Sequence, residues 1–205
     1  MKNRKDNCVF CKNGFPHDYQ LVSKAPRYWI LILSVEPQCD FHCLIVLKAS
    51  IIDKIGHISH VGDKRLPYEV MSELGSVLNK FSIAITKSDS TIEKILVVSL
   101  NTGKGSEHLH FHLIPKRYEE PVKMVNKPDE DGGGMFFLGR KEIVASTFSD
   151  FLDSTTGTES EELKNKIIKA TKAKVTKNAQ RLRKIFNEIW IVDNNPIQRT
   201  ANSRR

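Results

Sequence analysis

Hydrophobic positions in the first half of the chain fall into short apolar runs and one longer amphipathic segment. The short runs are rich in β-branched and aromatic residues and predict four strands, at residues 27–35, 42–47, 94–100 and 108–115. A proline-containing turn, EPQCDF, joins the first two runs and favours an antiparallel hairpin. Apolar residues at spacings of three and four predict a sheet-covering helix in residues 67–88, and SIIDKIG predicts a shorter helix at residues 50–56.

The pattern changes after about residue 120. Prolines, acidic residues and three consecutive glycines in EEPVKMVNKPDEDGGG indicate an exposed loop, and MFFLGRKEIVAS predicts one more strand. Apolar residues then recur at helical spacing between residues 160 and 190, with lysines and arginines on the other faces. This predicts one long amphipathic helix or two shorter ones. We therefore divide the chain into a domain of residues 1–125 and a C-terminal extension of residues 126–205.

Composition places the chain among globular proteins that bury a core, because it has 205 residues and 40% of them are apolar. It contains no run of about 18 apolar residues, and its N-terminus, MKNRKDNCVFCKNGF, turns polar where a signal peptide has its apolar segment. We therefore expect a soluble, cytoplasmic protein with no membrane contact. Its four cysteines are too few for a disulfide scaffold, and we expect them to be reduced.

The net charge of +8 is concentrated in the C-terminal extension. Residues 1–159 hold 20 Lys and Arg against 20 Asp and Glu, whereas residues 160–205 hold 12 against 4. A basic tail of this kind is able to bind nucleic acid, an anionic membrane surface or an acidic patch on the protein's own body.

Three of the seven histidines, His108, His110 and His112, stand at alternate positions of one predicted strand. Residues two apart in a strand point to the same side, so the three imidazoles form one row and the apolar residues between them face the core. Packing does not explain such a row, because buried imidazoles need hydrogen-bond partners and their charged forms are penalised by desolvation. The pattern indicates a chemical role.

Two chemistries use a row of imidazoles. A zinc site built on H-x-H recruits a third ligand and keeps one position open for water, whereas a nucleophilic site uses one neutral imidazole to attack phosphorus. The preceding loop, NTGKGSE, contains Gly105 and Ser106 and offers backbone N–H groups and a lysine to phosphate oxygens. It favours phosphate chemistry.

The segment HLHFHLIPK resembles the H-φ-H-φ-H-φ-φ signature of the histidine triad (HIT) superfamily, where φ is apolar. The order of CVFC, a strand, EPQCDFHCLIVLK, a helix and a strand ending at Asn101 is also similar to the family's, over roughly residues 6–118. The resemblance implies an α+β fold with an antiparallel sheet of about five strands and flanking helices, often dimeric. The basic helical extension is added to this fold at the C-terminus.

By this resemblance the protein is a nucleotide hydrolase of the dinucleoside polyphosphate or nucleoside phosphoramidate type. His110 would attack the α-phosphorus and form a nucleotidyl-histidine intermediate, which water or phosphate then resolves, with His108 and His112 as its catalytic partners. A neutral imidazole is a competent nucleophile at cellular pH, and the chemistry requires no cofactor. The triad-type transferases commonly carry Gln where His112 stands, so transfer to a sugar phosphate ranks below hydrolysis, and the choice between water and phosphate as the second acceptor stays open.

The resemblance also implies substrate-binding positions. Asn101 matches a family asparagine that contacts substrate, and the amides near Gly105 and Ser106 would stabilise negative charge on the phosphoryl group. Ser34 stands where the family has the Asp or Asn that holds the ribose hydroxyls, so ribose recognition is expected to differ. Phe41 replaces the glycine before His42, which predicts a different turn there.

Some family members bind structural zinc through an N-terminal C-x-x-C and histidines, and Cys8 with Cys11 matches the first half of such a site. The remaining ligands stay open among His17, His42, His57, His60 and the pair Cys39 and Cys43.

Two other functions remain open. One branch of the superfamily removes adenylate from DNA ends, and the basic C-terminal helix is suited to hold nucleic acid, although no cysteine follows Cys43 to build that branch's zinc finger. The other is a catalytically weak scaffold that binds nucleotides or partner proteins.

Overall fold

The computed structural model describes residues 8–11, 15–34, 39–99, 108–117, 124–128, 134–138 and 158–194. Of these, residues 124–128, 134–138, 158–168, 171 and 192–194 are described by their backbone alone. The described elements, in chain order, are β1 (Leu21–Ser23), β2 (Trp29–Leu33), β3 (Cys43–Leu47), α1 (Ala49–Ile55), α2 (Tyr68–Ser88), β4 (Ile92–Val98), β5 (His110–Arg117), β6 (Met124–Pro128), β7 (Gly134–Leu138) and α4 (Thr158–Asn194).

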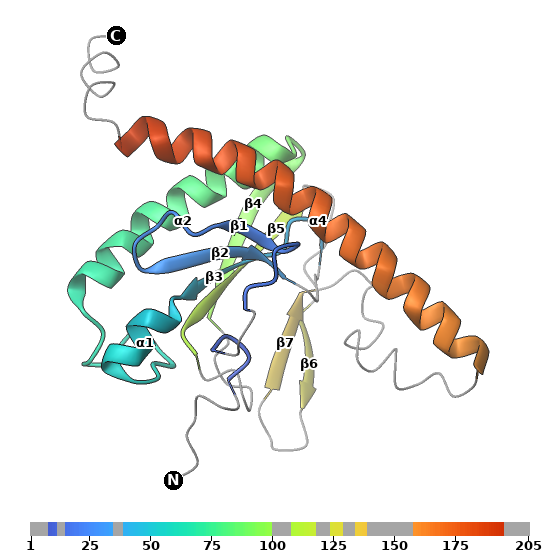
Figure 1. Ribbon diagram of the computed structural model, residues 1–205, viewed down its shortest axis with the longest axis horizontal. Coiled ribbons are helices and arrows are strands. Elements are labelled where there is room, and N and C mark those ends of the chain that lie inside the picture. Colours follow the sequence, from blue (N-terminus) through green and yellow to red (C-terminus); the bar gives the residue numbers. More distant parts are fainter. Residues whose placement is uncertain are drawn as a thin grey trace.

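Five strands form one antiparallel sheet in the order β1-β2-β3-β5-β4 (Figure 1). This confirms the predicted α+β fold and its five-stranded sheet. Four of the five strands lie where apolar runs predicted them, whereas the three-residue edge strand β1 was not predicted. A separate pair, β6 with β7, forms a two-stranded antiparallel sheet that begins two residues before the predicted extension, and β6 lies in a segment that was predicted to be a loop.

The two faces of the large sheet have different surroundings. One face carries Trp29, Ile45 and Phe111 into the main core, where residues of α2 and α4 pack against them. The other face carries Leu44 opposite His112 and Val46 opposite His110, so the histidines of β5 point away from the helices. Apolar side chains of the N-terminal segment cover part of this second face.

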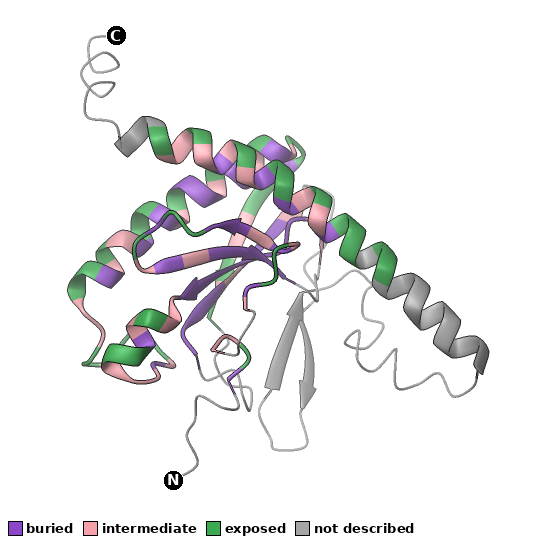
Figure 2. Cartoon of the chain, in the orientation of Figure 1, coloured by how far each residue is buried: buried purple, intermediate pink, exposed green. Residues whose placement is uncertain are grey.

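Helix α4 is a single helix, the first of the two predicted alternatives. It lies across the body beside α2 and the edge of the sheet, and its inward residues are buried there (Figures 1 and 2). Phe186 is fully buried with its ring centroid 5.8 Å from that of Phe81, and Arg183 donates to the backbone carbonyl of Leu21 at 2.5 Å. Within the described ranges, none of the helices combines the length and the hydropathy that crossing a membrane requires.

Candidate active site

Two histidines of β5 and one from the turn before β3 form a hydrogen-bonded row. Nε2 of His110 lies 3.2 Å from Nε2 of His112. Nδ1 of His112 lies 3.0 Å from Nε2 of His42. The pairing of β3 with β5 brings these rings together, because Leu44 is opposite His112 and His42 lies two positions before Leu44. Sequence reasoning treated His42 only as a candidate metal ligand and missed this contact.

Backbone contacts determine which nitrogen of His110 carries the proton. Nδ1 of His110 lies 2.6 Å from the backbone carbonyl oxygen of His108. A carbonyl accepts only, so Nδ1 is the donor and Nε2 of the neutral ring keeps its lone pair. His112 then donates from Nε2 to this lone pair and accepts at Nδ1 from Nε2–H of His42. The arrangement leaves Nε2 of His110 unprotonated and directed towards Nε2–H of His112.

Burial keeps the row uncharged. His110 is 4% exposed, and desolvation lowers its pKa from the ordinary histidine value. Desolvation, reinforced by the neighbouring His42 and His110, lowers the pKa of His112 to about 3. Phe10 contributes to this environment, since its ring centroid lies 4.7 Å from that of His110. Neutral imidazoles are the form that a nitrogen nucleophile requires.

The turn that presents His42 uses an unusual backbone conformation. Phe41 has a φ of 61°, in the left-handed region that glycine adopts without a steric penalty. Phe41 adopts this conformation although it is not glycine, at a steric cost of about 1–2 kcal/mol. Its side chain is buried. Ser34 is buried beside this turn, where its backbone N–H donates to the carbonyl of His42 at 2.9 Å. A ribose contact by its hydroxyl stays a prediction.

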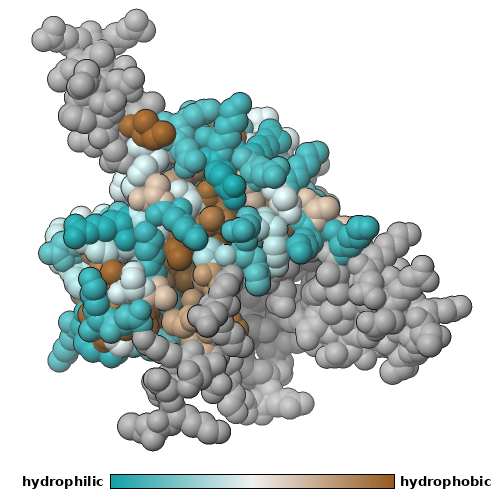
Figure 3. Space-filling model, in the orientation of Figure 1, coloured by the Kyte–Doolittle hydropathy of each residue, from teal (hydrophilic) through white to brown (hydrophobic). Residues whose placement is uncertain are grey.

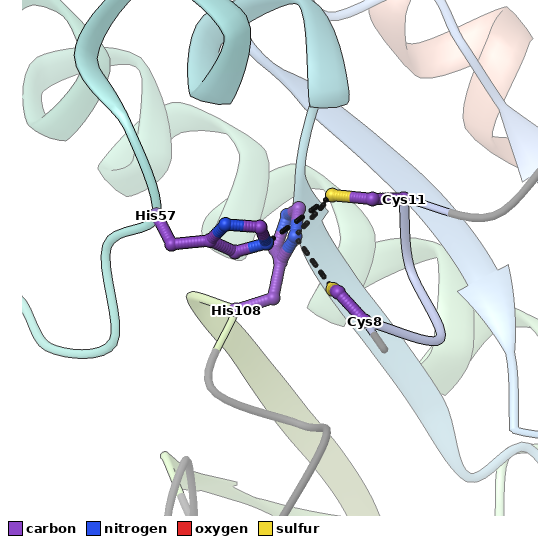
Figure 4. A group of neighbouring side chains, drawn as sticks. All are labelled: Cys8, Cys11, His57 and His108. Carbon is purple, nitrogen blue, oxygen red and sulfur yellow. Dashed lines mark hydrogen bonds between the residues drawn. The ribbon is translucent and has the colours of Figure 1, made fainter. Parts of the chain in front are cut away.

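His108 belongs to a second cluster. Its Nε2 donates to the backbone carbonyl of Leu47 at 2.6 Å, so its Nδ1 is unprotonated in the neutral ring and faces two thiols. The Sγ atoms of Cys8 and Cys11 lie 3.5 Å and 3.4 Å from this Nδ1. Nε2 of His57 lies 3.4 Å from Sγ of Cys11 (Figure 4). Burial is the main cause that lowers the pKa of His108, to about 4.

Cys8, Cys11, His57 and His108 offer four ligand atoms that lie within 4.8 Å of one another. Two thiolates and two imidazoles form a set typical of structural zinc, and tetrahedral coordination at about 2.0–2.3 Å needs only a small contraction of the cluster. The residues therefore fit a zinc ion. Cys8 and Cys11 are the predicted metal ligands, and His57 is one of the residues left open as a partner.

The other candidate ligands lie elsewhere in the structure. His42 contacts His112, while Cys39 and Cys43 donate to the backbone carbonyls of Pro115 and Phe41. His108 had been assigned to the catalytic row alone, and its ring instead faces the thiols. The N-terminal thiols and this strand are about 100 residues apart in the chain, so only the fold reveals the pairing. The predicted substrate contacts Asn101, Gly105 and Ser106 lie outside the described residues.

No family model matches the chain. The chain is 27% identical over 134 residues to the adenosine 5'-monophosphoramidase HNT1 of Candida albicans, an alignment covering 60% of this chain and 80% of that protein. Its structure matches a zinc-bound histidine triad family protein from Mycobacterium smegmatis with a TM-score of 0.51 and 16% identity, over 90% of this chain and 96% of the other. The chain therefore resembles histidine triad proteins in its histidine motif and in its fold. A Hit-like protein from Bartonella henselae matches with a TM-score of 0.48 and 17% identity, over 88% and 97% of the two chains.

Proposed function

We propose that this histidine triad protein is a nucleotide hydrolase that acts at the α-phosphate through a covalent nucleotidyl-histidine on His110. The observation that carries the proposal is the hydrogen bond from Nδ1 of His110 to the carbonyl of His108, which leaves Nε2 of the buried, neutral ring unprotonated. The similarity to a monophosphoramidase favours a nucleoside phosphoramidate as the substrate class.

In the first step, the Nε2 lone pair of His110 forms a bond to the α-phosphorus, and the bond between phosphorus and the leaving group breaks. The leaving group takes the electron pair of the broken bond and a proton. His112 is placed to supply that proton, because its Nε2–H points towards Nε2 of His110, where the phosphorus would arrive. His42 holds the ring of His112 in this orientation through the contact between Nε2 and Nδ1.

In the second step, water attacks the phosphorus on the side opposite Nε2 of His110. The nitrogen–phosphorus bond breaks, its electron pair returns to the imidazole, and one proton of the water passes to His112. The products are the nucleoside monophosphate and a site in its starting protonation state. Division of one displacement into two steps lowers each barrier, and the Phe10 ring beside His110 limits competing water around the nucleophile.

Zinc bound by Cys8, Cys11, His57 and His108 would supply structural cross-linking and no reacting group. It would hold the N-terminal segment, and with it Phe10, over the histidine row.

The test is hydrolysis of adenosine 5'-phosphoramidate without added metal, with product analysis by chromatography. We expect wild type to release adenosine monophosphate and His110→Ala to lose at least about 10⁴-fold in kcat, because no other group makes the bond to phosphorus. His60→Ala is the matched control, since His60 is exposed and lies outside the row. Unchanged turnover in a folded His110→Ala protein would exclude the nucleophile assignment.

A second measurement identifies the acceptor and the intermediate. Reaction in ¹⁸O-labelled water should place the label on the product phosphate, whereas transfer to inorganic phosphate would give a nucleoside diphosphate. Rapid acid quench with α-³²P-labelled substrate should leave label on wild type and none on His110→Ala. Turnover without any labelled protein would favour direct attack by water.

A further inference from the structure

The described cations of α4 fall into two sets, and one set serves to hold the helix on the body. Nζ of Lys174 pairs with a carboxylate oxygen of Asp40 at 2.6 Å, and Nζ of Lys172 lies 4.9 Å from the centroid of the Tyr19 ring. Arg183 donates to backbone carbonyls near β1. These contacts flank the buried apolar face of the helix, so they assist its docking.

The second set points away from the body. It consists of Lys169, Lys177, Arg181 and Lys184, which we call the basic ridge, and all four are exposed. Lys177, Arg181 and Lys184 follow one another at spacings of four and three and therefore share one side of the helix. The ridge extends along about 22 Å of the axis at 1.5 Å per residue.

The ridge has no partner in the part of the molecule that the structure describes. None of its four cations forms an ion pair among the described residues, and between residues 169 and 191 the helix holds one acidic residue, Glu188. Figure 3 shows mostly hydrophilic side chains over this part of α4. Since other residues dock the helix, four cations in a row are not needed for folding, and their mutual repulsion is relieved when an anion binds.

The geometry of the ridge favours nucleic acid over a membrane surface as its anionic partner. A membrane-binding helix inserts its apolar face into lipid, but the apolar face of α4 is occupied, with Leu182 and Phe186 fully buried against the body. What remains outside is a band of charges on a rigid helix, with Lys177, Arg181 and Lys184 on one side of it. A line of phosphates matches it, since each strand of duplex DNA carries one charge per roughly 3.4 Å.

We propose that the basic ridge binds nucleic acid through its phosphates, without reading the base sequence. Lys174, which shares a flank of α4 with Arg181, pairs with Asp40, two residues before His42, so this flank of the helix is held to the turn before β3. The proposal does not depend on the reaction proposed for His110.

The experiment measures fluorescence anisotropy of labelled 20-nucleotide single-stranded and duplex DNA with the full chain at several salt concentrations. Lys177→Gln, Arg181→Gln and Lys184→Gln are combined as the ridge variant. Lys54→Gln, Lys64→Gln and Lys87→Gln, three exposed lysines elsewhere, form a control with the same net charge. Both variants are first compared with wild type by circular dichroism, and His110→Ala is included to separate binding from turnover.

We expect wild type to bind with an affinity that falls steeply with salt, and the ridge variant to bind at least about tenfold more weakly. For duplex DNA the slope of log K against log salt should be smaller in the ridge variant by up to about 2.7, at about 0.9 for each lost phosphate contact. The control variant and His110→Ala should bind as wild type does. Equal losses in the ridge and control variants, or no binding by wild type at low salt, would overturn the proposal. So would ridge-dependent binding to phosphatidylserine vesicles but not to DNA.

Discussion

His108 serves two parts of the candidate site with different atoms. Its backbone carbonyl accepts from Nδ1 of His110 and fixes the tautomer of this proposed nucleophile, whereas its ring faces Cys8 and Cys11. Because the backbone of His108 makes the contact with His110, replacement of the His108 side chain should not remove it. The three histidines of the motif are therefore not equivalent, and the ring that completes the catalytic row beside His112 comes from His42.

His42→Ala tests that assignment. The ring of His42 touches His112 and not the nucleophile, so its loss should leave His112 able to rotate and should slow proton transfer. We expect kcat to fall about 10–100-fold with a small change in KM, which is typical of a residue that orients a catalytic group. Steady-state kinetics with the phosphoramidate provide the measurement.

His42→Asn is the conservative variant, because an amide still donates to Nδ1 of His112, and it should recover part of the loss. His17→Ala, at an exposed position outside the row, should behave as wild type. Equal kinetics for His42→Ala and wild type would remove His42 from the site.

Among the elements, helix α4 is the one whose role depended most on three-dimensional contacts. Its residues Val175, Ala179, Leu182 and Phe186 are buried against the body, and they recur at spacings of four, three and four. The periodicity predicts the apolar face, but it does not say whether that face meets the body, a second copy or a partner. In the structure, the apolar face of α4 packs against the part of the body formed by α2 and β1.

Phe186→Ala measures this docking. The ring is fully buried and meets Phe81 edge to face, so its removal should lower the free energy of unfolding by about 3 kcal/mol. Urea unfolding followed by circular dichroism gives the value. Ile191→Ala on the same helix is the control, because Ile191 is 64% exposed and its loss should cost less than about 0.5 kcal/mol. Equal effects of the two substitutions would show that α4 is not docked through Phe186.

The turn from α2 into β4 is linked to β5 by a carboxylate with a shifted pKa. Asp89 accepts from Thr91 at 2.6 Å and from Arg117 at 2.7 Å, and these bonds, Thr91 first, lower its pKa to about 2. The ionised form is favoured in the folded state. Its contribution is therefore complete above the unfolded pKa of about 3.9 and is lost as pH falls through about 2.

Asp89→Asn isolates this contribution from the other carboxylates. The difference in free energy of unfolding between wild type and the variant should be about 1 kcal/mol at pH 7, because the pair is partly exposed and solvent screens it. It should shrink towards zero between pH 4 and pH 2. Urea titrations of both proteins across this range test the prediction, and a difference that stays constant with pH would contradict it.

Local patterns were sufficient for most elements of this fold. Strands β2 and β3 are predictable because β-rich apolar residues are continuous along them, β5 because apolar residues alternate with histidines at its start, and α2 because its apolar residues recur every three or four positions. Strand β1 was missed because three residues hold too little pattern. The motif in β5 placed His110 and His112 on one face of the strand, since alternation along a strand is itself a local property.

Contacts between distant segments were the part that local patterns did not predict. His57 lies 46 residues from Cys11, and His42 lies 70 residues from His112. Nothing near His57 distinguishes it from His60, which is exposed three positions later. Only the path of the chain after α1 brings one of the two to the thiols.

At the scale of the whole molecule, the four-residue cluster joins segments that the sheet alone does not hold. Cys8 and Cys11 come from the N-terminal segment, His57 from the connection after α1, and His108 from the residues before β5 (Figure 4). A bound ion closes loops of about 50 and 100 residues in the chain, and such closures restrict the unfolded state most. Zinc is therefore expected to contribute to the stability of the whole fold.

We expect protein purified without chelators to contain about one zinc per chain, measured by mass spectrometry of the metal. Removal with a strong chelator should lower the melting temperature by about 10 °C, since several kcal/mol of binding energy stabilise only the folded chain. Cys8→Ser with Cys11→Ser should give the same low melting temperature and no response to chelator, whereas Cys39→Ser, a thiol outside the cluster, should keep both metal and stability.

The metal-free protein should retain measurable turnover, because His110 keeps its bond to the carbonyl of His108 and no reacting group is a ligand. Complete loss of turnover in a protein that is still folded would mean that the ion acts in the reaction, and an unchanged melting temperature would mean that the cluster holds no structural metal.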